Sequence, residues 1–343
     1  MKVLVTGAGG FLGVQVVERL LAHGYSDIRC FLRDRGKAER LLALDESHRG
    51  PQLELCYGNL RLRADCARAV ADVSLVVHLA AGLKGAPAEL FADSVVASRN
   101  LLEALQARDN MPLKQTRVVL VSSFGVYGVV SLRRGARIDE LTPLEDHPEM
   151  RDTYSHSKLR QEQLFWDYQK KAGFELVVLR PGVIYGPGGG AFSNRVGLQI
   201  GPVFFHLGGS NLLPLSFVVN CAEAIVQAAG HPGSAGQVYN VHDDDLPTAS
   251  RYLREYKRHV KRMRSIRLPY FATKMLARSL EAYRRHSQGQ LPGIITPYKA
   301  AAAWGGNKFD NAKLHALGWR QLVATQDAMA ETFTYLRQQG AKQ

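Results

Sequence analysis

The chain has 343 residues, 46% of them hydrophobic and 22% charged, with a formal net charge of +13, which fits a globular protein with one large core or two lobes. It contains no run of about 18 apolar residues, so we expect no membrane span. Its four cysteines form no CxxC pair and have no histidines at zinc spacing, so we expect no metal site, and without a zinc-finger or RNA-recognition signature we expect no nucleic-acid partner.

The first residues, KVLVT at 2–6, predict a short buried strand. A secretory signal peptide would need a longer apolar region followed by a cleavage site. We therefore expect a cytoplasmic protein. Glycines follow the strand, and the amphipathic stretch VQVVERLLAHG, which ends at Gly24, predicts the first helix.

Further short apolar runs predict strands, and the amphipathic segments between them predict helices. The predicted strands are 28–32, 53–58, 74–80, 117–123 and 175–181, and the predicted helices include 93–107 and 155–171. Strands that alternate with helices predict an α/β fold with a doubly wound parallel sheet of the Rossmann type, covered by helices on both faces.

The pattern changes after about residue 187, where GPGGG (186–190) predicts a flexible break. We predict a dinucleotide-binding domain over 1–187 and a smaller, mainly substrate-binding lobe over 188–343. Some late segments are expected to return to the sheet. A last amphipathic helix is predicted near 326–338.

Residues 251–285 contain twelve Lys or Arg and only two acids, interleaved with Leu, Tyr, Phe and Met. The simpler interpretation is a solvated helical face. The alternative is a peripheral contact with a membrane, because basic residues mixed with apolar ones suit an anionic lipid surface.

The first strand and the first helix are joined by a glycine loop, which contains Gly7, Gly9, Gly10 and Gly13. A tight turn needs glycine where φ is positive, and the missing Cβ lets the backbone approach a pyrophosphate. The N–H groups at the start of the helix favour that anion. The loop therefore predicts a dinucleotide cofactor, contacted by Gly7, Gly10, Phe11, Leu12 and Gly13.

The end of the second strand bears on which dinucleotide binds. It reads Arg33-Asp34-Arg35, with Lys37 and Arg40 just beyond. Guanidinium groups suit a 2′-phosphate, so Arg33 favours NADP over NAD. Asp34 supports the alternative, because an acid at the end of this strand can bind the ribose 2′-OH of NAD.

Tyr154-Ser-His-Ser-Lys158 stands at the start of a predicted helix, and the spacing of four places both side chains on one helical face. A phenol with a pKa of about 10 is a poor acid at neutral pH, and a nearby ammonium lowers that pKa. We expect Lys158 to do this and to hold the nicotinamide ribose, while Tyr154 exchanges a proton with a carbonyl oxygen. Ser123, at the end of the fifth strand, is expected to orient that oxygen.

The same spacing occurs a second time, in Tyr270-Phe-Ala-Thr-Lys274 within the basic region. Neither a predicted strand nor a serine precedes it, so we interpret this copy as a coincidence. Spacing alone proves little, and the strand end before Tyr154 distinguishes the two copies.

Five segments together resemble the extended short-chain dehydrogenase/reductase superfamily of the NAD-dependent epimerase/dehydratase type. They are TGAGGFLG (6–13), VVHLAA (76–81), VSSFGVYG (121–128), YSHSK (154–158) and LRPGVIYGPGGG (179–190), in the family's order. The resemblance implies that Ser123, Tyr154 and Lys158 are catalytic and that the protein is a homodimer. It also implies cofactor contacts at Asn59, Leu60, Leu79, Ala80, Ala81, Pro181 and Val183.

The chain departs from the family pattern at two positions before the catalytic helix. Asn59 stands where an Asp is usual beside the adenine, and an amide can still bond there. Ser94 replaces a usual Asn, which weakens any inference about a chain of water molecules in the active site.

Val183 stands where nucleotide-sugar epimerases and dehydratases usually carry an Asn. RPGVIYGPG, FLRD (31–34) and FVVNCAEAI (217–225) are instead similar to the 3β-hydroxysteroid dehydrogenase and dihydroflavonol reductase branches. We therefore expect an NADP(H)-dependent oxidoreductase acting on a ketone or secondary alcohol of a fairly apolar small molecule. The alternatives are a nucleotide-sugar epimerase or dehydratase with tightly bound NAD(P), and a non-catalytic cofactor-binding regulatory protein.

Overall fold

The computed structural model describes residues 1–47, 52–109, 111–286 and 297–340. Its main sheet has seven strands, all paired in parallel, in the order β12-β7-β5-β4-β1-β2-β3. These strands are β1 (Val3–Thr6), β2 (Ile28–Leu32), β3 (Leu53–Tyr57), β4 (Leu75–His78), β5 (Arg117–Val121), β7 (Glu175–Pro181) and β12 (Val238–Val241). The predicted doubly wound parallel sheet is confirmed. Its strand order reverses between β1 and β4, and such a switch point is where open parallel sheets bind ligands.

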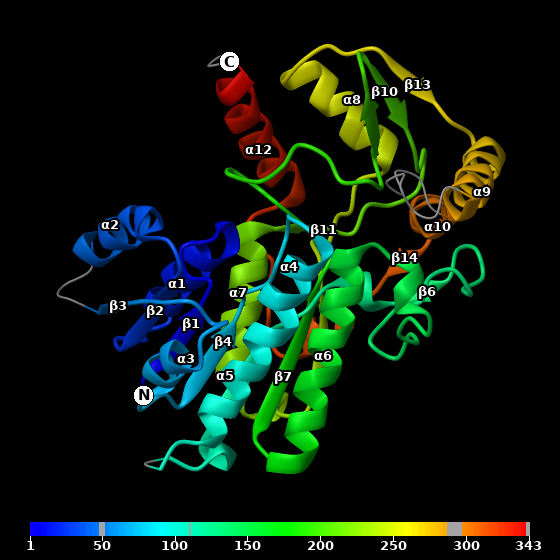
Figure 1. Ribbon diagram of the computed structural model, residues 1–343. Helices are drawn as coiled ribbons and strands as arrows, with labels where there is room; N and C mark the ends of the chain where they lie inside the picture. Colours follow the sequence, from blue (N-terminus) through cyan, green and yellow to red (C-terminus); the bar gives the residue numbers. More distant parts are fainter. Residues whose placement is uncertain (48–51, 110, 287–296, 341–343) are drawn as a thin grey trace.

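Helices cover both faces of the sheet, because alternate residues of each strand point to opposite sides (Figure 1). Val3 and Val5 of β1 belong to a core shared with α1 (Phe11–Ala22), α2 (Glu39–Ser47) and α7 (Val218–Gly230). Leu4 belongs to the opposite core, which is shared with α3 (Arg63–Val70), α5 (Ala97–Gln106) and α6 (Thr153–Ala172). Burial on both faces explains why these strands read as continuous apolar runs.

The helix expected at 93–107 begins earlier and is interrupted. It consists of α4 (Pro87–Phe91), a π-helical turn over Ala92–Val96, and α5. Pro87 occupies the first helical position, where its missing N–H costs no hydrogen bond. The π turn adds a residue to the helical cycle, so it changes which side chains face the sheet.

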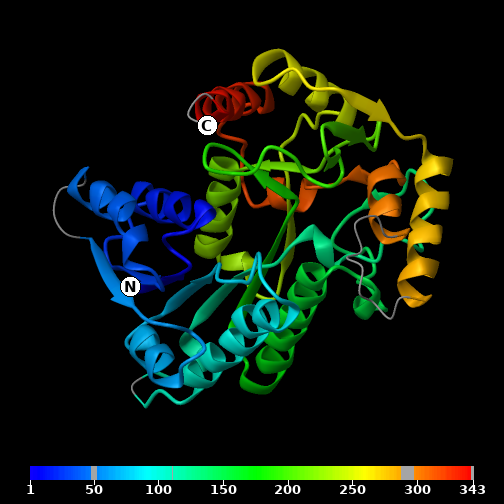
Figure 2. The same cartoon turned by 45° about the horizontal axis from the view of Figure 1, so that its top comes forward.

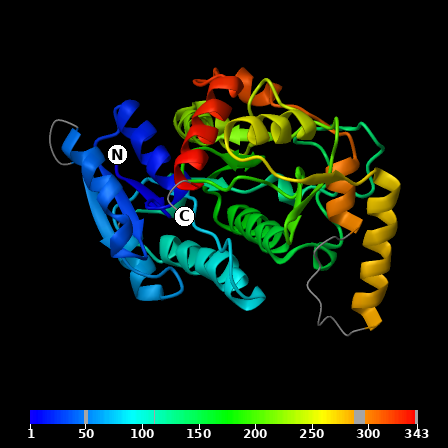
Figure 3. The same ribbon diagram turned by 90° about the horizontal axis from the view of Figure 1, so that it is seen from above.

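The second lobe gathers on one side of the main sheet (Figures 1 and 2). It is built from β9 (Gly197–Ile200), β10 (Val203–His206), β13 (Ser265–Arg267), α8 (Ala249–His259), α9 (Tyr270–His286), α10 (Pro297–Trp304) and α12 (Thr325–Gly340). The first three form a small sheet in the order β13-β10-β9. Tyr252 and Phe333 join α8 to α12 with their ring centroids 5.3 Å apart. Figure 3 shows α9 at the periphery of the molecule.

Short strand pairs connect the two halves of the chain. β8 (Val183–Tyr185) pairs with β11 (Leu215–Phe217), and β6 (Arg137–Ile138) pairs with β14 (Lys308–Phe309), just before α11 (Ala312–Ala316). Although α7 and β12 come after residue 187, α7 packs on α1 and β12 pairs with β7. The boundary at residue 187 stays a prediction. Among the described residues, no helix is long and apolar enough to cross a membrane.

A buried ion pair fixes α6 against the main sheet. Arg180 Nη2 on β7 lies 2.5 Å from Glu162 Oε1 on α6, with side-chain exposures of 5% and 0%. The Ser122 hydroxyl also donates to Glu162 Oε2, at 2.5 Å. On the other side, Arg180 Nη1 donates to the Tyr127 hydroxyl at 3.1 Å, and that hydroxyl donates to Asn240 Oδ1 at 2.6 Å. The network therefore ties α6 to the carboxyl ends of β5, β7 and β12.

Removing one charge from this pair should strongly destabilise the protein. We expect Glu162→Gln to lower the free energy of unfolding by about 3–5 kcal/mol, because Arg180 would be left buried without a counter-charge. Glu175→Gln is the matched control, since Glu175 pairs with Arg117 at 2.6 Å but is 48% exposed, and should cost less than about 1 kcal/mol. Urea unfolding followed by circular dichroism measures both changes, and equal losses would contradict the prediction.

Candidate active site

The glycine loop turns directly from β1 into α1. Gly7 has a φ of +71°, and the Gly10 N–H donates to the Gly7 carbonyl at 3.0 Å. A Cβ on Gly13 would lie 2.1 Å from that same carbonyl oxygen, and a Cβ on Gly9 would lie 2.8 Å from Lys37 Cβ. Gly10 is the N-cap of α1 and has no side chain that could accept from the first N–H groups. The loop thus fits a pyrophosphate at a helix N-terminus.

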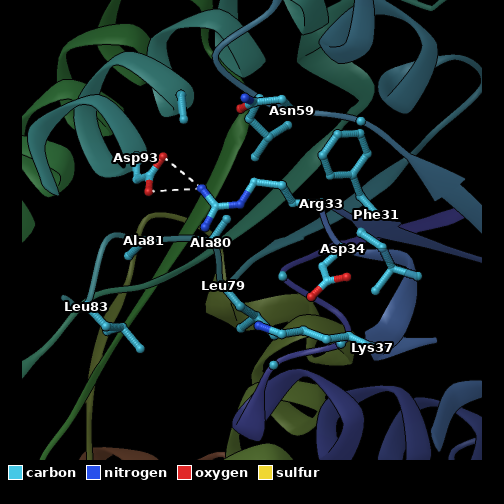
Figure 4. Close-up of a pocket in the computed structure, with 17 residues that line it drawn as sticks. Phe31, Arg33, Asp34, Lys37, Asn59, Leu79, Ala80, Ala81, Leu83 and Asp93 are labelled. Carbon is cyan, nitrogen blue, oxygen red and sulfur yellow. Dashed lines mark hydrogen bonds and ion pairs between the residues drawn. The ribbon is translucent and has the colours of Figure 1, made fainter. Parts of the chain in front are cut away.

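A pocket of about 360 Å³ opens beside this loop (Figure 4). Eight of the residues predicted to contact the cofactor line it: Gly7, Gly10, Arg33, Asn59, Leu60, Leu79, Ala80 and Ala81. Its volume and its glycine wall suit the adenosine end of a dinucleotide. Tyr154 and Lys158, which are also predicted to contact the cofactor, do not line it, and neither do five further predicted contacts: Phe11, Leu12, Gly13, Pro181 and Val183.

The five further residues outside the pocket lining have identifiable places in the fold. Phe11 begins α1 and lies against the glycine-rich segment after β8, where a Cβ on Gly189 would be 3.0 Å from Phe11 Cζ. Leu12 packs between two hydrophobic cores. Gly13 lies against the backbone carbonyls of Gly7 and Ala8 in the loop. Pro181 ends β7, and Val183 begins β8. Their contact with a cofactor stays a prediction.

Sequence reasoning missed Asp93, which lines the pocket opposite Arg33. Arg33 Nη1 lies 3.1 Å from Asp93 Oδ2, and Arg61 Nε lies 2.7 Å from Asp93 Oδ1. Figure 4 shows the Arg33 side chain extended across the pocket toward this carboxylate. Asp93 stands in the π-helical turn before α5, so its direction depends on a helical interruption that the sequence does not reveal.

Asp34 also lines the pocket, on the opposite side of the β2 end from Arg33. Its Oδ1 accepts from the Gly36 N–H at 2.9 Å and caps the short helical turn Arg35–Lys37. Part of its hydrogen-bonding capacity is therefore used within its own loop.

Ser123, Tyr154 and Lys158 come together at the carboxyl edge of the main sheet. Ser123 follows β5, and its hydroxyl lies near enough to the Tyr154 phenol to offset part of the rise that burial causes in the pKa of that phenol. Tyr154 opens α6, whose N-cap, Asp152, accepts from the Ser155 N–H at 3.0 Å. Lys158 lies one turn further and is buried, and its Nζ donates to the Val121 carbonyl at 2.6 Å. The arrangement brings two hydroxyl groups and an amine to one place.

Known proteins resemble this chain in sequence and fold. The pattern of the NAD dependent epimerase/dehydratase family matches residues 3–241 of the chain. The chain belongs to this family. As a member, it is an NAD(P)-dependent enzyme of the extended short-chain dehydrogenase/reductase type.

Individual relatives of this family member catalyse different reactions. A 3-beta-hydroxysteroid dehydrogenase from Mycolicibacterium neoaurum is 26% identical over 355 residues, covering 97% of this chain and 91% of that protein. A 4-hydroxy-2-methyl-3-oxo-4-farnesyl-3,4-dihydroquinoline-1-oxide ketoreductase from Stigmatella aurantiaca is 30% identical over 247 residues, covering 71% and 68%. The crystal structure of UDP-glucuronic acid 4-epimerase from Bacillus cereus in complex with NAD has a TM-score of 0.69 at 18% identity, covering 99% of both chains. At this identity, the structural likeness shows the fold alone.

Burial dominates the electrostatics of this family member's site. Burial raises the pKa of Tyr154, and the hydrogen bond with Ser123 offsets part of that rise. Burial also lowers the pKa of Lys158 to about 7, against the opposing charge of Glu162. The expected lowering of the Tyr154 pKa by Lys158 is wrong for this arrangement. The Lys158 ammonium donates instead to the Val121 carbonyl and to the side chain of Gln161.

The second Tyr-x-x-x-Lys copy lies elsewhere in the enzyme. Tyr270 and Lys274 stand in the first turn of α9, with Lys274 Nζ 5.9 Å from the Tyr270 ring centroid. Arg134 also lies over this ring, at 5.4 Å. Within the residues that the structure covers, no group of three or more His, Cys, Asp or Glu is placed to hold a metal ion.

Proposed function

We propose that this enzyme is an NADP(H)-dependent oxidoreductase that transfers a hydride between the nicotinamide and a ketone or secondary alcohol of a fairly apolar small molecule. The observation that carries the proposal is that the Ser123 hydroxyl lies near the Tyr154 phenol, with Lys158 buried one turn further along the same helix. These groups stand at the edge where open parallel sheets bind ligands. The likeness to a dehydrogenase over nearly the whole chain supports the same reaction class.

Each side chain has a distinct task in this reaction. The bound cofactor supplies or accepts the hydride. The Ser123 hydroxyl orients the carbonyl oxygen of the substrate, and Tyr154 gives that oxygen its phenolic proton as negative charge develops there. Because burial raises its pKa, Tyr154 is protonated at neutral pH, as this step requires. The Lys158 ammonium holds the ribose of the nicotinamide through its N–H donors.

Removing the phenolic hydroxyl should abolish turnover without abolishing cofactor binding. We expect Tyr154→Phe to lower kcat by about 100-fold or more, since a positioned general acid contributes at least that much. NADPH oxidation with a panel of ketones measures the loss, and fluorescence titration measures the cofactor Kd. Tyr270→Phe is the matched control, because it alters the other Tyr-x-x-x-Lys copy, and it should retain wild-type activity. Activity that survives Tyr154→Phe would refute this mechanism.

The alternative reaction is that of a nucleotide-sugar epimerase or dehydratase, in which the hydride leaves and returns to one bound cofactor. Membership of a family whose description includes epimerases and dehydratases supports this alternative. Net oxidation of added NADPH by a ketone would exclude it. A copurifying cofactor with no net turnover would favour it. The adjoining Ser123 and Tyr154 argue against the third reading, a regulatory protein that only binds the cofactor.

The preference for NADP rests on the cations at the adenosine end of the pocket. Arg33 and Lys37 both line it, and the Arg33 side chain is 66% exposed. A guanidinium there can bind a 2′-phosphate through two parallel hydrogen bonds. Asp34, the residue that would favour NAD, already caps its own loop.

We expect Arg33→Ala to raise the Kd for NADPH by at least about tenfold and to change the Kd for NADH much less. Isothermal titration with each cofactor measures the two constants. Arg35→Ala provides the control, because Arg35 lies over the Tyr57 ring at 4.7 Å and does not line the pocket. An equal loss of affinity for both cofactors would show that Arg33 does not recognise the 2′-phosphate.

A second part of the proposal is a peripheral contact between the basic region and anionic membranes. The exposed cations on α8, the loop 260–264, β13 and α9 include Arg254, Arg258, Lys261, Arg262, Arg264, Arg267, Lys274 and Arg278. On α9 at the periphery of the molecule (Figure 3), Phe271 and Met275 are 67% and 63% exposed, whereas Thr273 and Ala277 are fully buried. Apolar side chains spaced four apart and flanked by cations suit an anionic lipid surface. The homodimer and the cytoplasmic location stay predictions.

Binding to lipid should depend on both charge and the apolar stripe of α9. We expect the protein to sediment with vesicles that contain phosphatidylserine at low salt, and to be released at high salt. Phe271→Glu should weaken sedimentation, whereas Leu141→Glu, at a site that is 91% exposed outside this region, should not. The absence of salt-sensitive binding would rule out the contact.

A further inference from the structure

We infer that Gln161 is a positioning residue for Lys158, and that it couples this lysine to the backbone that lines the cofactor pocket. The inference rests on the proposed function, because it concerns the same site. Gln161 is completely buried and lies three residues after Lys158, on the face of α6 that meets the main sheet.

The contacts of Gln161 determine how its amide is turned. Its Nε2 donates to Ser98 Oγ at 2.8 Å and lies 3.3 Å from the carbonyl oxygens of Ala80 and Ser94. Three oxygen acceptors therefore lie around the amide nitrogen, and His78 Nε2 lies 3.2 Å from it. The amide oxygen is left facing Lys158, and it accepts a hydrogen bond from the Lys158 ammonium.

The polar groups behind Gln161 hold that orientation, beginning at the first strand. Thr6 Oγ1 accepts from the N–H groups of Leu79 and Ala80, at 3.2 and 3.3 Å. Both of its lone pairs are then occupied, so its proton must go to His78 Nδ1, which lies 2.9 Å away. Burial lowers the pKa of His78 to about 3, so the ring is neutral and carries its proton on Nε2.

The His78 Nε2 proton then points to Ser98 Oγ, at 2.9 Å, and the Ser98 hydroxyl donates to the Ser94 carbonyl at 2.5 Å. Ser98 Oγ can thus only accept from Gln161. Reversing the amide would turn its N–H₂ group toward the Lys158 ammonium, so that two donors would meet, although its oxygen would then lie within reach of His78 Nε2, which is 3.2 Å from the amide nitrogen. The contact with the Lys158 ammonium, together with the Ser98, Ala80 and Ser94 oxygens around the amide nitrogen, therefore favours this orientation of the amide.

The charge state of Lys158 depends on few groups. On its own helix, Glu162 is held by Arg180 of β7, and Tyr154 is a neutral phenol. From β4, His78 contributes no charge. The Gln161 oxygen and the Val121 carbonyl are therefore the acceptors that stabilise the ammonium against the cost of its burial.

The same amide links the amine to the cofactor wall. Ala80 lines the pocket, its carbonyl contacts Gln161 Nε2, and its N–H is bonded to Thr6. Gln161 also contacts the carbonyl of Ser94, the residue that stands where the family usually has an asparagine. In this chain, an amide on α6 contacts Lys158.

The test compares Gln161→Met and Gln161→Glu with the same changes at Gln163, a partly buried residue of the same helix that bonds Arg160 instead. The pKa of Lys158 is measured by carbon NMR of protein labelled at lysine Cε, with Lys158→Arg to assign the signal. We expect Gln161→Met to lower this pKa and Gln161→Glu to raise it, each by about one unit or more, because an acceptor is lost or a negative charge gained. The changes at Gln163 should leave it unaltered.

The pH dependence of ketone reduction provides the second readout. Reduction needs a charged Lys158, so its rate should fall as pH rises through the pKa of this lysine. That fall should move to lower pH in Gln161→Met and to higher pH in Gln161→Glu. If Gln161→Met does not fold, Gln161→Glu, which keeps the size and one accepting oxygen, decides alone.

Two results separate this inference from the proposed function. A Lys158 pKa that is the same in the Gln161 and Gln163 variants would overturn the inference, whatever the turnover. A Lys158 pKa that moves as expected, in a protein that reduces no ketone, would overturn the proposed reaction and leave the positioning role standing.

Discussion

The buried contact between Glu162 and Arg180 is the constraint on which the rest of the site depends. One carboxylate of α6 receives a guanidinium from β7 and a hydroxyl from the end of β5, and the same guanidinium reaches Asn240 of β12 through Tyr127. Such a pair stabilises a fold only when every hydrogen bond is made, since half of it would leave a buried charge. The helix that carries Tyr154 and Lys158 therefore has one position against the sheet.

Lys158 lies between this charged network and a neutral one. At spacings of three and four, Gln161 and Glu162 share the sheet-facing side of α6 with it. Glu162 stabilises the ammonium through its negative charge. Gln161 stabilises it by accepting a hydrogen bond from the ammonium with its side-chain oxygen. Burial lowers the pKa of this amine to about 7, and the charge of Glu162 opposes that fall. The contacts of Glu162 with Arg180 and Ser122, which fix α6 against the sheet, therefore also fix the positions of Tyr154 and Lys158 on that helix.

Much of this could be predicted from local patterns, and the rest depends on contacts between distant segments. The strands, the glycine loop and the Tyr154–Lys158 spacing can be predicted because each depends on the pattern of a few neighbouring residues. Asp93 and Gln161 were missed because their partners come from elsewhere: Arg33 lies 60 residues from Asp93, and Ser98 lies 63 residues from Gln161. The pKa of Tyr154 was predicted in the wrong direction for the same reason. The spacing on the helix places Lys158 near Tyr154, but the acceptors around the buried amine determine that it donates to Val121 and Gln161.

At the adenosine end of the pocket, Arg33 is also held by a neighbouring acceptor, but less firmly than Lys158. Asp93 binds two arginines, Arg33 and Arg61, and its contact with Arg61 is the shorter, at 2.7 Å. If Arg33 turned to a 2′-phosphate, Asp93 would keep a charged partner, and the exposed Arg33 would exchange one anion for another at little cost in desolvation. Lys158 has no such freedom, since it is buried and its acceptors are fixed. The exposed Arg33 side chain can therefore turn from Asp93 to a ligand, whereas the buried Lys158 keeps its place and a ligand must bind beside it.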